Sequence, residues 1–138
     1  MSTTEDVLRQ VPLFRGMSDR TIASVGGIAH PGSFAAGEVI VREGDVGDSF
    51  IVITAGTAAV TQGGRPLRTL GDGDFLGEIA LIDGGPRTAT VTATTDIEAL
   101  VIDRDGFGRL MSEFPVIRLD LVTALTQRLR ERAPDPTD

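Results

Sequence analysis

The sequence predicts a mainly β fold, a sandwich or roll of short strands with helices at both ends. Most of the 17 glycines lie between Gly32 and Gly85, where short β-branched runs alternate with turn residues. Outside this region, apolar residues recur at helical spacing. At 138 residues the chain fits one domain with one core, and its 41% hydrophobic content is ordinary for a globular protein.

A helix is expected before the β region. Ser18 is of a residue type that favours the N-cap position, and the periodic pattern after it continues as far as His30 and Pro31. The apolar face of this helix is expected to comprise Ile22, Val25 and Ile28. His30, the only histidine, is interpreted as a terminal or capping residue of the helix rather than as a base.

Six segments between residues 31 and 102 are strand candidates, separated by Gly-Asp, Ala-Gly and Gly-Gly turns. They are residues 38–42, 49–54, 57–62, 66–70, 87–93 and 97–102. The Gly-Asp pairs at 44–45, 47–48 and 71–74 resemble fragments of calcium loops, but no segment has the full EF-hand spacing. We therefore interpret them as turns.

Two helices are expected over residues 103–132, followed by a frayed polar tail at 133–138. Asp103 is expected to cap the first, which carries Phe107, Leu110 and Met111, and Pro115 to open the second. The apolar stripe of the second helix is interpreted as core, with lid and dimer contacts as secondary roles; it consists of Leu119, Val122, Leu125 and Leu129. The arginines at 128, 130 and 132 are interpreted as partners of the helix C-terminus.

Composition excludes several classes of function. The formal charge of −7 opposes binding to a phosphate backbone, so nucleic acid is not an expected partner. Cysteine is absent, which removes thiolate chemistry and disulfides. The acidic start and the lack of a long apolar run argue against a signal peptide and a membrane span, so the expected location is the cytoplasm. With one histidine, a nucleophile and base pair is hard to assemble, and we expect no catalysis.

One segment, residues 75–91, carries chemistry beyond that of a hairpin. Gly77 permits close approach of the backbone to a ligand, and the short run after it can form a helical turn whose free N–H groups would bind an anion. Arg87 follows ten residues later, and its guanidinium matches phosphate oxygens. Glu78 is only an acceptor, so its natural partner is a hydroxyl such as a ribose 2′-OH.

This segment resembles the phosphate-binding cassette of cyclic-nucleotide-binding domains, the family of protein kinase A regulatory subunits and the catabolite activator protein. The family pattern is met from Gly77 to Val91, with Leu76 inserted between the aromatic residue and the glycine. The resemblance continues through the segments at 11–14 and 43–50 and the turn glycine Gly56, and covers about residues 7–131.

The resemblance implies an eight-stranded β-roll with one or two N-terminal helices and two C-terminal helices, the last swinging over the base as a lid. It also implies a ligand set. The amides of Ile79 and Ala80 and the side chain of Arg87 would hold the cyclic phosphate, helped by Thr88 and the Ala89 amide, and Glu78 would take the ribose 2′-OH beside Gly77. Thr88 permits cGMP without excluding cAMP.

Two functions are weighed. The first is a single-domain sensor of cAMP or cGMP, needing no cofactor, that signals to a separate effector protein or a homodimer partner. The second is a protein-interaction module that keeps the roll and has lost the nucleotide. A cyclic-nucleotide hydrolase is disfavoured because plausible metal ligands around His30 are absent from the sequence.

Overall fold

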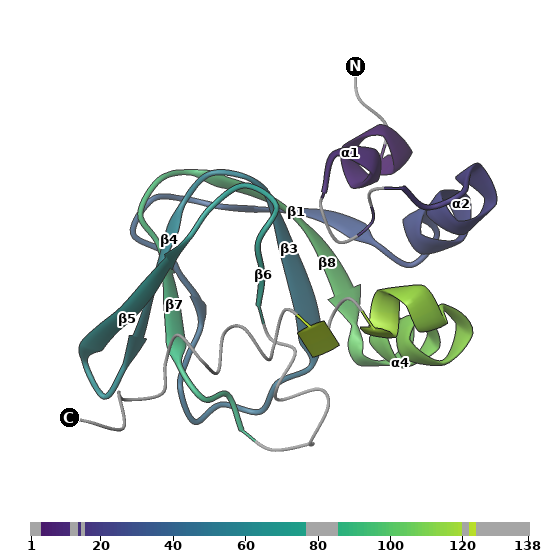
Figure 1. Ribbon diagram of the computed structural model, residues 1–138. Coiled ribbons are helices and arrows are strands. Elements are labelled where there is room, and N and C mark those ends of the chain that lie inside the picture. Colours follow the sequence, from purple (N-terminus) through teal and green to yellow (C-terminus); the bar gives the residue numbers. More distant parts are fainter. Residues whose placement is uncertain (1–3, 12–13, 15, 77–85, 120–121, 124–138) are drawn as a thin grey trace, which may run out of the picture.

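The computed structural model describes residues 4–11, 14, 16–76, 86–119 and 122–123 (Figure 1). These residues form a two-sheet β-roll with helices packed beside one sheet. The helices are α1 (Thr4–Gln10), α2 (Asp19–Gly26) and α4 (Arg104–Glu113). The strands are β1 (His30–Phe34), β2 (Val39–Val41), β3 (Ser49–Ala55), β4 (Ala58–Gln62), β5 (Arg65–Leu70), β6 (Phe75–Leu76), β7 (Thr90–Ala93) and β8 (Ile97–Asp103).

The strands make two antiparallel sheets, ordered β1-β8-β3-β6 and β2-β7-β4-β5. Each sheet has four strands, so the described part of the chain contains the eight strands that the resemblance implies. Consecutive strands lie in different sheets at every step except β4–β5, which winds the chain into a roll. The mainly β prediction is confirmed.

Strand β3 is buried on both faces because the helices cover one face of its sheet and the second sheet covers the other. Phe50 and Val52 join the core that the helices share, whereas Ile51 and Ile53 join the core inside the roll. Alternate residues of a strand point to opposite faces, so an unbroken apolar run marks a strand between two layers. Strand β8 divides its apolar residues in the same way.

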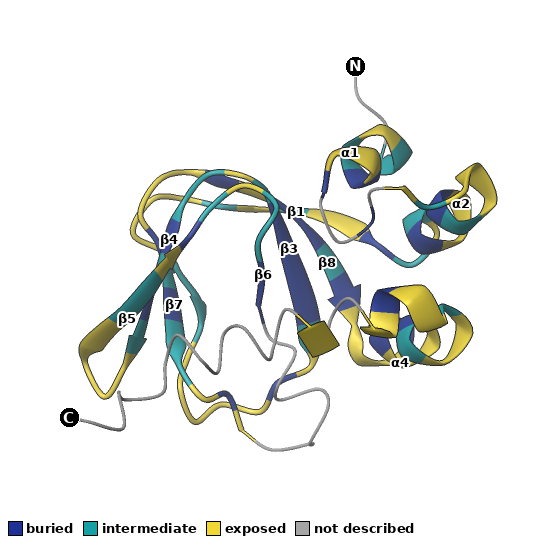
Figure 2. Ribbon diagram, in the orientation of Figure 1, coloured by how far each residue is buried: buried dark blue, intermediate teal, exposed yellow. Residues whose placement is uncertain are grey.

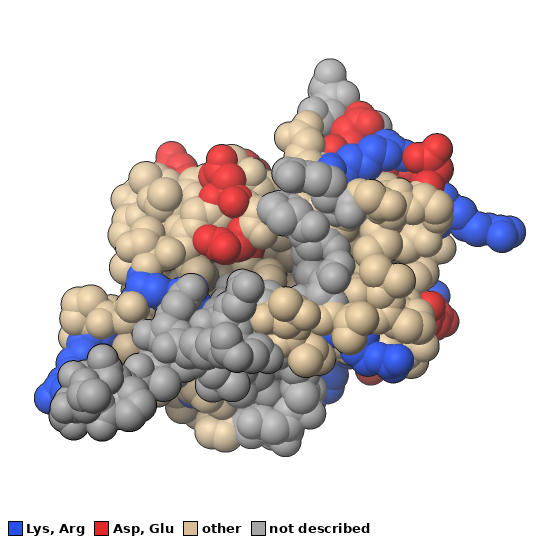
Figure 3. Space-filling model, in the orientation of Figure 1, with Lys and Arg blue, Asp and Glu red and all other residues tan. Residues whose placement is uncertain are grey.

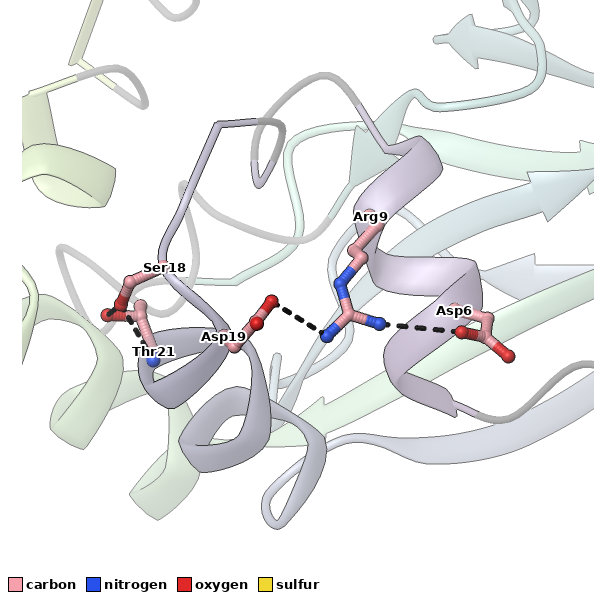
Figure 4. Close-up of polar contacts among 5 residues, drawn as sticks. All are labelled: Asp6, Arg9, Ser18, Asp19 and Thr21. Carbon is pink, nitrogen blue, oxygen red and sulfur yellow. Dashed lines mark hydrogen bonds and ion pairs between the residues drawn. The ribbon is translucent and has the colours of Figure 1, made fainter.

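The N-terminal helices are held to each other by polar contacts as well as by apolar packing. The Ser18 hydroxyl accepts from the Thr21 amide at 3.2 Å, which confirms the predicted N-cap of α2. Figure 4 shows Arg9 of α1 reaching Asp19 of α2 at 3.1 Å and Asp6 of its own helix at 3.4 Å. These side chains are largely exposed, so the ion pairs contribute little beside the buried Leu8 and Ile22.

His30 was expected at the end of a helix, and this prediction is wrong. Helix α2 ends at Gly26, and His30 opens β1, where it pairs with Val101 of β8. The sequence of β1, His-Pro-Gly-Ser-Phe, contains proline and glycine, which disfavour a strand, so pairing with β8 decides its conformation. Strand β6 was also missed, because two residues are too few to show a period.

Helix α4 matches its prediction. The Asp103 carboxylate accepts from the Gly106 amide at 2.7 Å as the N-cap, and Phe107 and Leu110 are buried. The Phe107 ring lies 5.1 Å from that of Phe50, which places α4 against β3. The sheet and the helix therefore share one core.

The apolar stripe of the last predicted helix is not core where it is described, contrary to expectation. Residues 115–119 and 122–123 are helical, but Leu119 and Val122 are 67% and 54% exposed. Ile117 carries the packing instead and is fully buried in the helix-side core. Figure 2 shows this helical stretch largely exposed. Leu125, Leu129, the three arginines and the tail lie outside the described residues.

Candidate functional site

Arg87 lies in a turn immediately before β7, rather than inside a strand as the sequence suggested. Its backbone is paired with the loop between β2 and β3: the Gly44 amide donates to the Arg87 carbonyl at 2.8 Å, and the Arg87 amide donates to the Asp45 carbonyl at 2.7 Å. Next to it, Pro86 and Val46 form an isolated β-bridge. The loop therefore fixes the position of the Arg87 backbone, from which the side chain extends.

The Arg87 guanidinium is buried, with the residue only 6% exposed. Its Nη2 donates to the Ser49 carbonyl at 3.0 Å and lies 3.4 Å from the Ser49 hydroxyl, at the start of β3. A buried guanidinium is costly unless its charge and its five donors are matched by acceptors, and an anionic oxygen pair suits its fork. The position suits a phosphate.

A second arginine supports the same loop from the helix side. Arg104, the first residue of α4, donates through Nη2 to the Gly47 carbonyl. Gly47 is buried while Val46, one residue earlier, is 80% exposed. The loop that faces Arg87 is thus held between the roll and α4.

Thr88 and Ala89 complete the turn. Thr88 is exposed, and its carbonyl accepts from Gln62 Nε2 at 2.9 Å. Ala89 is half-buried against the core of the roll. The three described candidates, Arg87, Thr88 and Ala89, therefore occupy one short segment that leads into β7.

A groove of about 520 Å³ adjoins this segment, a size in the usual range for small-molecule sites. Its lining comes from strand β2, the residues before it, the β2–β3 loop, Ser49 and Arg87: Gly37, Glu38, Val39, Ile40, Val41, Arg42, Asp45, Val46, Asp48, Ser49 and Arg87. The charges of the lining are mixed. Figure 3 likewise shows both basic and acidic side chains among the described residues of one face.

The other four predicted site residues, Gly77, Glu78, Ile79 and Ala80, lie outside the described residues. Sequence reasoning missed the groups that hold the described half of the site. In the sequence, Ser49 was identified only as the start of a predicted strand and Gln62 only as the end of another. Both act through contacts with residues 26 to 38 positions away, and no local pattern carries such a signal.

None of the helices within the described ranges is long and apolar enough to cross a membrane. In the same ranges, the Gly-Asp pairs at 71–74 form turns: Asp74 accepts from the Gly71 amide at 2.8 Å, and Asp72 accepts from the Gly56 amide at 2.8 Å. This confirms the turn interpretation for that segment.

Comparison with known proteins identifies relatives. The protein-family model described as cyclic nucleotide-binding domain matches residues 31–114 of the sequence. The chain is 40% identical over 114 residues to cGMP-dependent protein kinase, isozyme 1, of Drosophila melanogaster, covering 77% of this chain and 15% of the kinase. It is 37% identical over 109 residues to a cAMP-dependent protein kinase regulatory subunit of Emericella nidulans, covering 78% of this chain and 26% of that protein. The chain thus spans about a quarter or less of these two relatives.

Solved structures agree. The complex of Sp-2Cl-cAMPS with PKAR CBD2 superposes with a TM-score of 0.80 at 30% identity, covering 96% of this chain and 91% of that one. The Thermus thermophilus catabolite activator protein superposes with a TM-score of 0.78 at 30% identity, covering 87% and 59% of the two chains. With the family model matching more than half of its residues, the chain belongs to the cyclic nucleotide-binding domain family.

Proposed function

We propose that this chain binds a cyclic nucleotide, cAMP or cGMP, with the cyclic phosphate on Arg87. The observation that carries the proposal is the buried guanidinium of Arg87, fixed beside Ser49 in the turn where the family pattern has its arginine. Thr88 and the Ala89 amide would assist at the phosphate. The amides of Ile79 and Ala80 would complete the anion site, and Glu78, beside Gly77, would accept from the ribose 2′-OH.

The chemistry of this arrangement is capture rather than conversion. A guanidinium and backbone amides stabilise a singly charged phosphate, and a carboxylate accepts from a hydroxyl, so these groups serve to hold the ligand. We propose a sensor in which one domain binds the nucleotide and a separate effector or a second copy reads the change. Support comes from the relatives, which include kinase regulatory subunits.

A second function, protein interaction without nucleotide, is favoured by one observation. Val116, Leu119 and Val122 are all more than half exposed within the helical residues 115–119 and 122–123. Exposed apolar residues that form a contiguous patch are typical of interaction surfaces. This function and nucleotide sensing predict different responses to ligand.

A thermal melt with cAMP, cGMP and 5′-AMP separates the two functions. A ligand that binds only the native state stabilises it by RT ln(1 + [L]/Kd), about 2.7 kcal/mol at a hundredfold excess over Kd. We expect cAMP and cGMP to raise the melting temperature by several degrees and 5′-AMP, with a different phosphate charge and shape, to leave it nearly unchanged. If the melting curves with all three nucleotides at millimolar concentration match the curve without ligand, the sensor is excluded and the interaction module is favoured.

A further inference from the structure

The backbone of residues 87–90 is held along one side by the loop after β2. Besides the two Arg87 backbone bonds to Gly44 and Asp45, the Glu43 amide donates to the Thr90 hydroxyl at 3.0 Å. These contacts fix the two ends of the segment, at Arg87 and at Thr90. Thr88, between them, needs a separate partner.

That partner comes from the other side, from the hairpin of β4 and β5. Gln62 is the last residue of β4, and its carboxamide nitrogen donates to the Thr88 carbonyl at 2.9 Å. The hairpin turns through Gly63 and Gly64, whose φ angles of 57° and 80° suit a two-residue type I′ turn. This turn sets Gln62 opposite Arg65 and thereby places the carboxamide beside Thr88.

The two sides are joined by one residue. The Gly63 amide donates to Glu43 Oε1 at 2.9 Å, while the Glu43 amide holds Thr90. Glu43, Gln62 and Gly63 thus enclose the segment from Arg87 to Thr90 in a chain of hydrogen bonds, which we call the hairpin brace. The brace belongs to neither the family cassette nor the groove lining.

We propose that Gln62 and Glu43 are positioning residues for nucleotide binding, acting through the backbone of Arg87, Thr88 and Ala89. The proposal rests on the proposed function, since it concerns the same ligand. Neither residue is expected to touch the nucleotide. The brace limits the conformations of the turn before the ligand arrives, so less ordering remains to oppose binding. It also holds the Thr88 backbone, which carries the hydroxyl on which discrimination of guanine would depend.

Replacing Gln62→Met tests the donor, because methionine has a similar length and volume but no amide. We expect cAMP and cGMP to bind about three- to tenfold more weakly, the usual worth of one hydrogen bond. The bond is exposed, so the melting temperature without ligand should stay within about 2 °C of wild type. The control is Thr69→Val, an exposed residue of β5 in the same hairpin, which should change neither quantity.

A readout without ligand separates positioning from general destabilisation. In ¹H–¹⁵N spectra of the ligand-free protein, Gln62→Met should shift the Ala89 amide resonance, which follows the Thr88 carbonyl, and should speed its hydrogen exchange. Core amides in β3 and β8 should be unchanged. Uniform acceleration throughout the sheets would instead indicate a structural role.

Glu43 supplies the second test. Glu43→Gln keeps an oxygen that can accept from the Gly63 amide. Its affinity for both nucleotides should therefore fall by no more than twofold relative to wild type. Glu43→Leu removes the acceptor and should weaken binding as Gln62→Met does. Equal weakening by both variants would show that the charge of Glu43, and not the brace, matters.

The wild-type titration comes first and distinguishes the two possible failures. If wild type binds neither cAMP nor cGMP, the proposed function fails and the positioning role fails with it. If wild type binds, but Gln62→Met and Glu43→Leu bind within 1.5-fold of it, the positioning role is refuted and the proposed function stands.

Discussion

Arg87→Ala should affect both affinity and stability, and the structure assigns a magnitude to each. Loss of a charge-assisted bidentate contact with phosphate should weaken nucleotide binding by roughly 2–4 kcal/mol, about thirty- to a thousandfold in Kd. The residue is 6% exposed and its guanidinium donates to Ser49. Truncation therefore also leaves the Ser49 carbonyl without this donor and opens space at the start of β3.

The cost in stability should be roughly 1.5–3 kcal/mol, the usual range for a hydrogen bond made by a charged group. From the sequence alone, the arginine would be oriented mainly by the ligand, and its removal would leave stability nearly intact. The buried position argues otherwise. For a domain of this size, the melting temperature should fall by several degrees.

Isothermal titration calorimetry at 15 °C, where the variant remains folded, measures affinity, and a thermal melt by circular dichroism measures stability. Arg20→Ala, which removes an exposed arginine of α2, is the control for lost charge and should match wild type in both. If Arg87→Ala binds either nucleotide within threefold of wild type, the assignment of the phosphate to Arg87 is wrong. An unchanged melting temperature would refute the predicted contribution of Arg87 to stability.

Four further outcomes are expected. Glu78→Gln, which keeps an acceptor, should weaken binding less than Glu78→Ala, and equal losses in calorimetry would mean that the ribose hydroxyl is not its partner. Thr88→Ala should weaken cGMP more than cAMP by about 0.5–1.5 kcal/mol, and paired titrations would contradict this if both ligands lost equally. Gly56→Ala should destabilise the fold by roughly 2–4 kcal/mol in urea unfolding, because φ is +115° and an added Cβ would lie 2.5 Å from the Asp96 carbonyl oxygen. An unchanged urea midpoint would contradict this prediction. Asp103→Ala should cost about 1 kcal/mol in the same assay by removing the α4 cap, whereas Asp105→Ala, in the same first turn, should cost less.

The features visible in the sequence were local ones. The N-caps Ser18 and Asp103 were identified because a cap uses a side chain and an amide three residues apart. The central strands were identified because their alternation and turn residues are short-range patterns. The approximate extent of the roll followed from the same signals.

Errors occurred where a distant contact overrides local preference. The Pro-Gly segment of β1 becomes a strand because β8 offers it a partner, and β6 exists only as two residues beside β3. Leu119 and Val122 have the spacing of a core stripe, but Ile117 points to the core instead. Periodicity shows that a face is apolar and does not show what covers it.

The fold class, the family resemblance and the residue types at the phosphate site follow from local patterns, since Arg87 and Thr88 stand in a contiguous motif. The burial of Arg87 against Ser49, and the enclosure of its segment by Glu43 and Gln62, depend on tertiary contacts. Those contacts join residues separated by 20 or more positions and depend on how the β4–β5 hairpin meets the β2–β3 loop. Such meetings are set by packing of the whole roll, which no short stretch of sequence records.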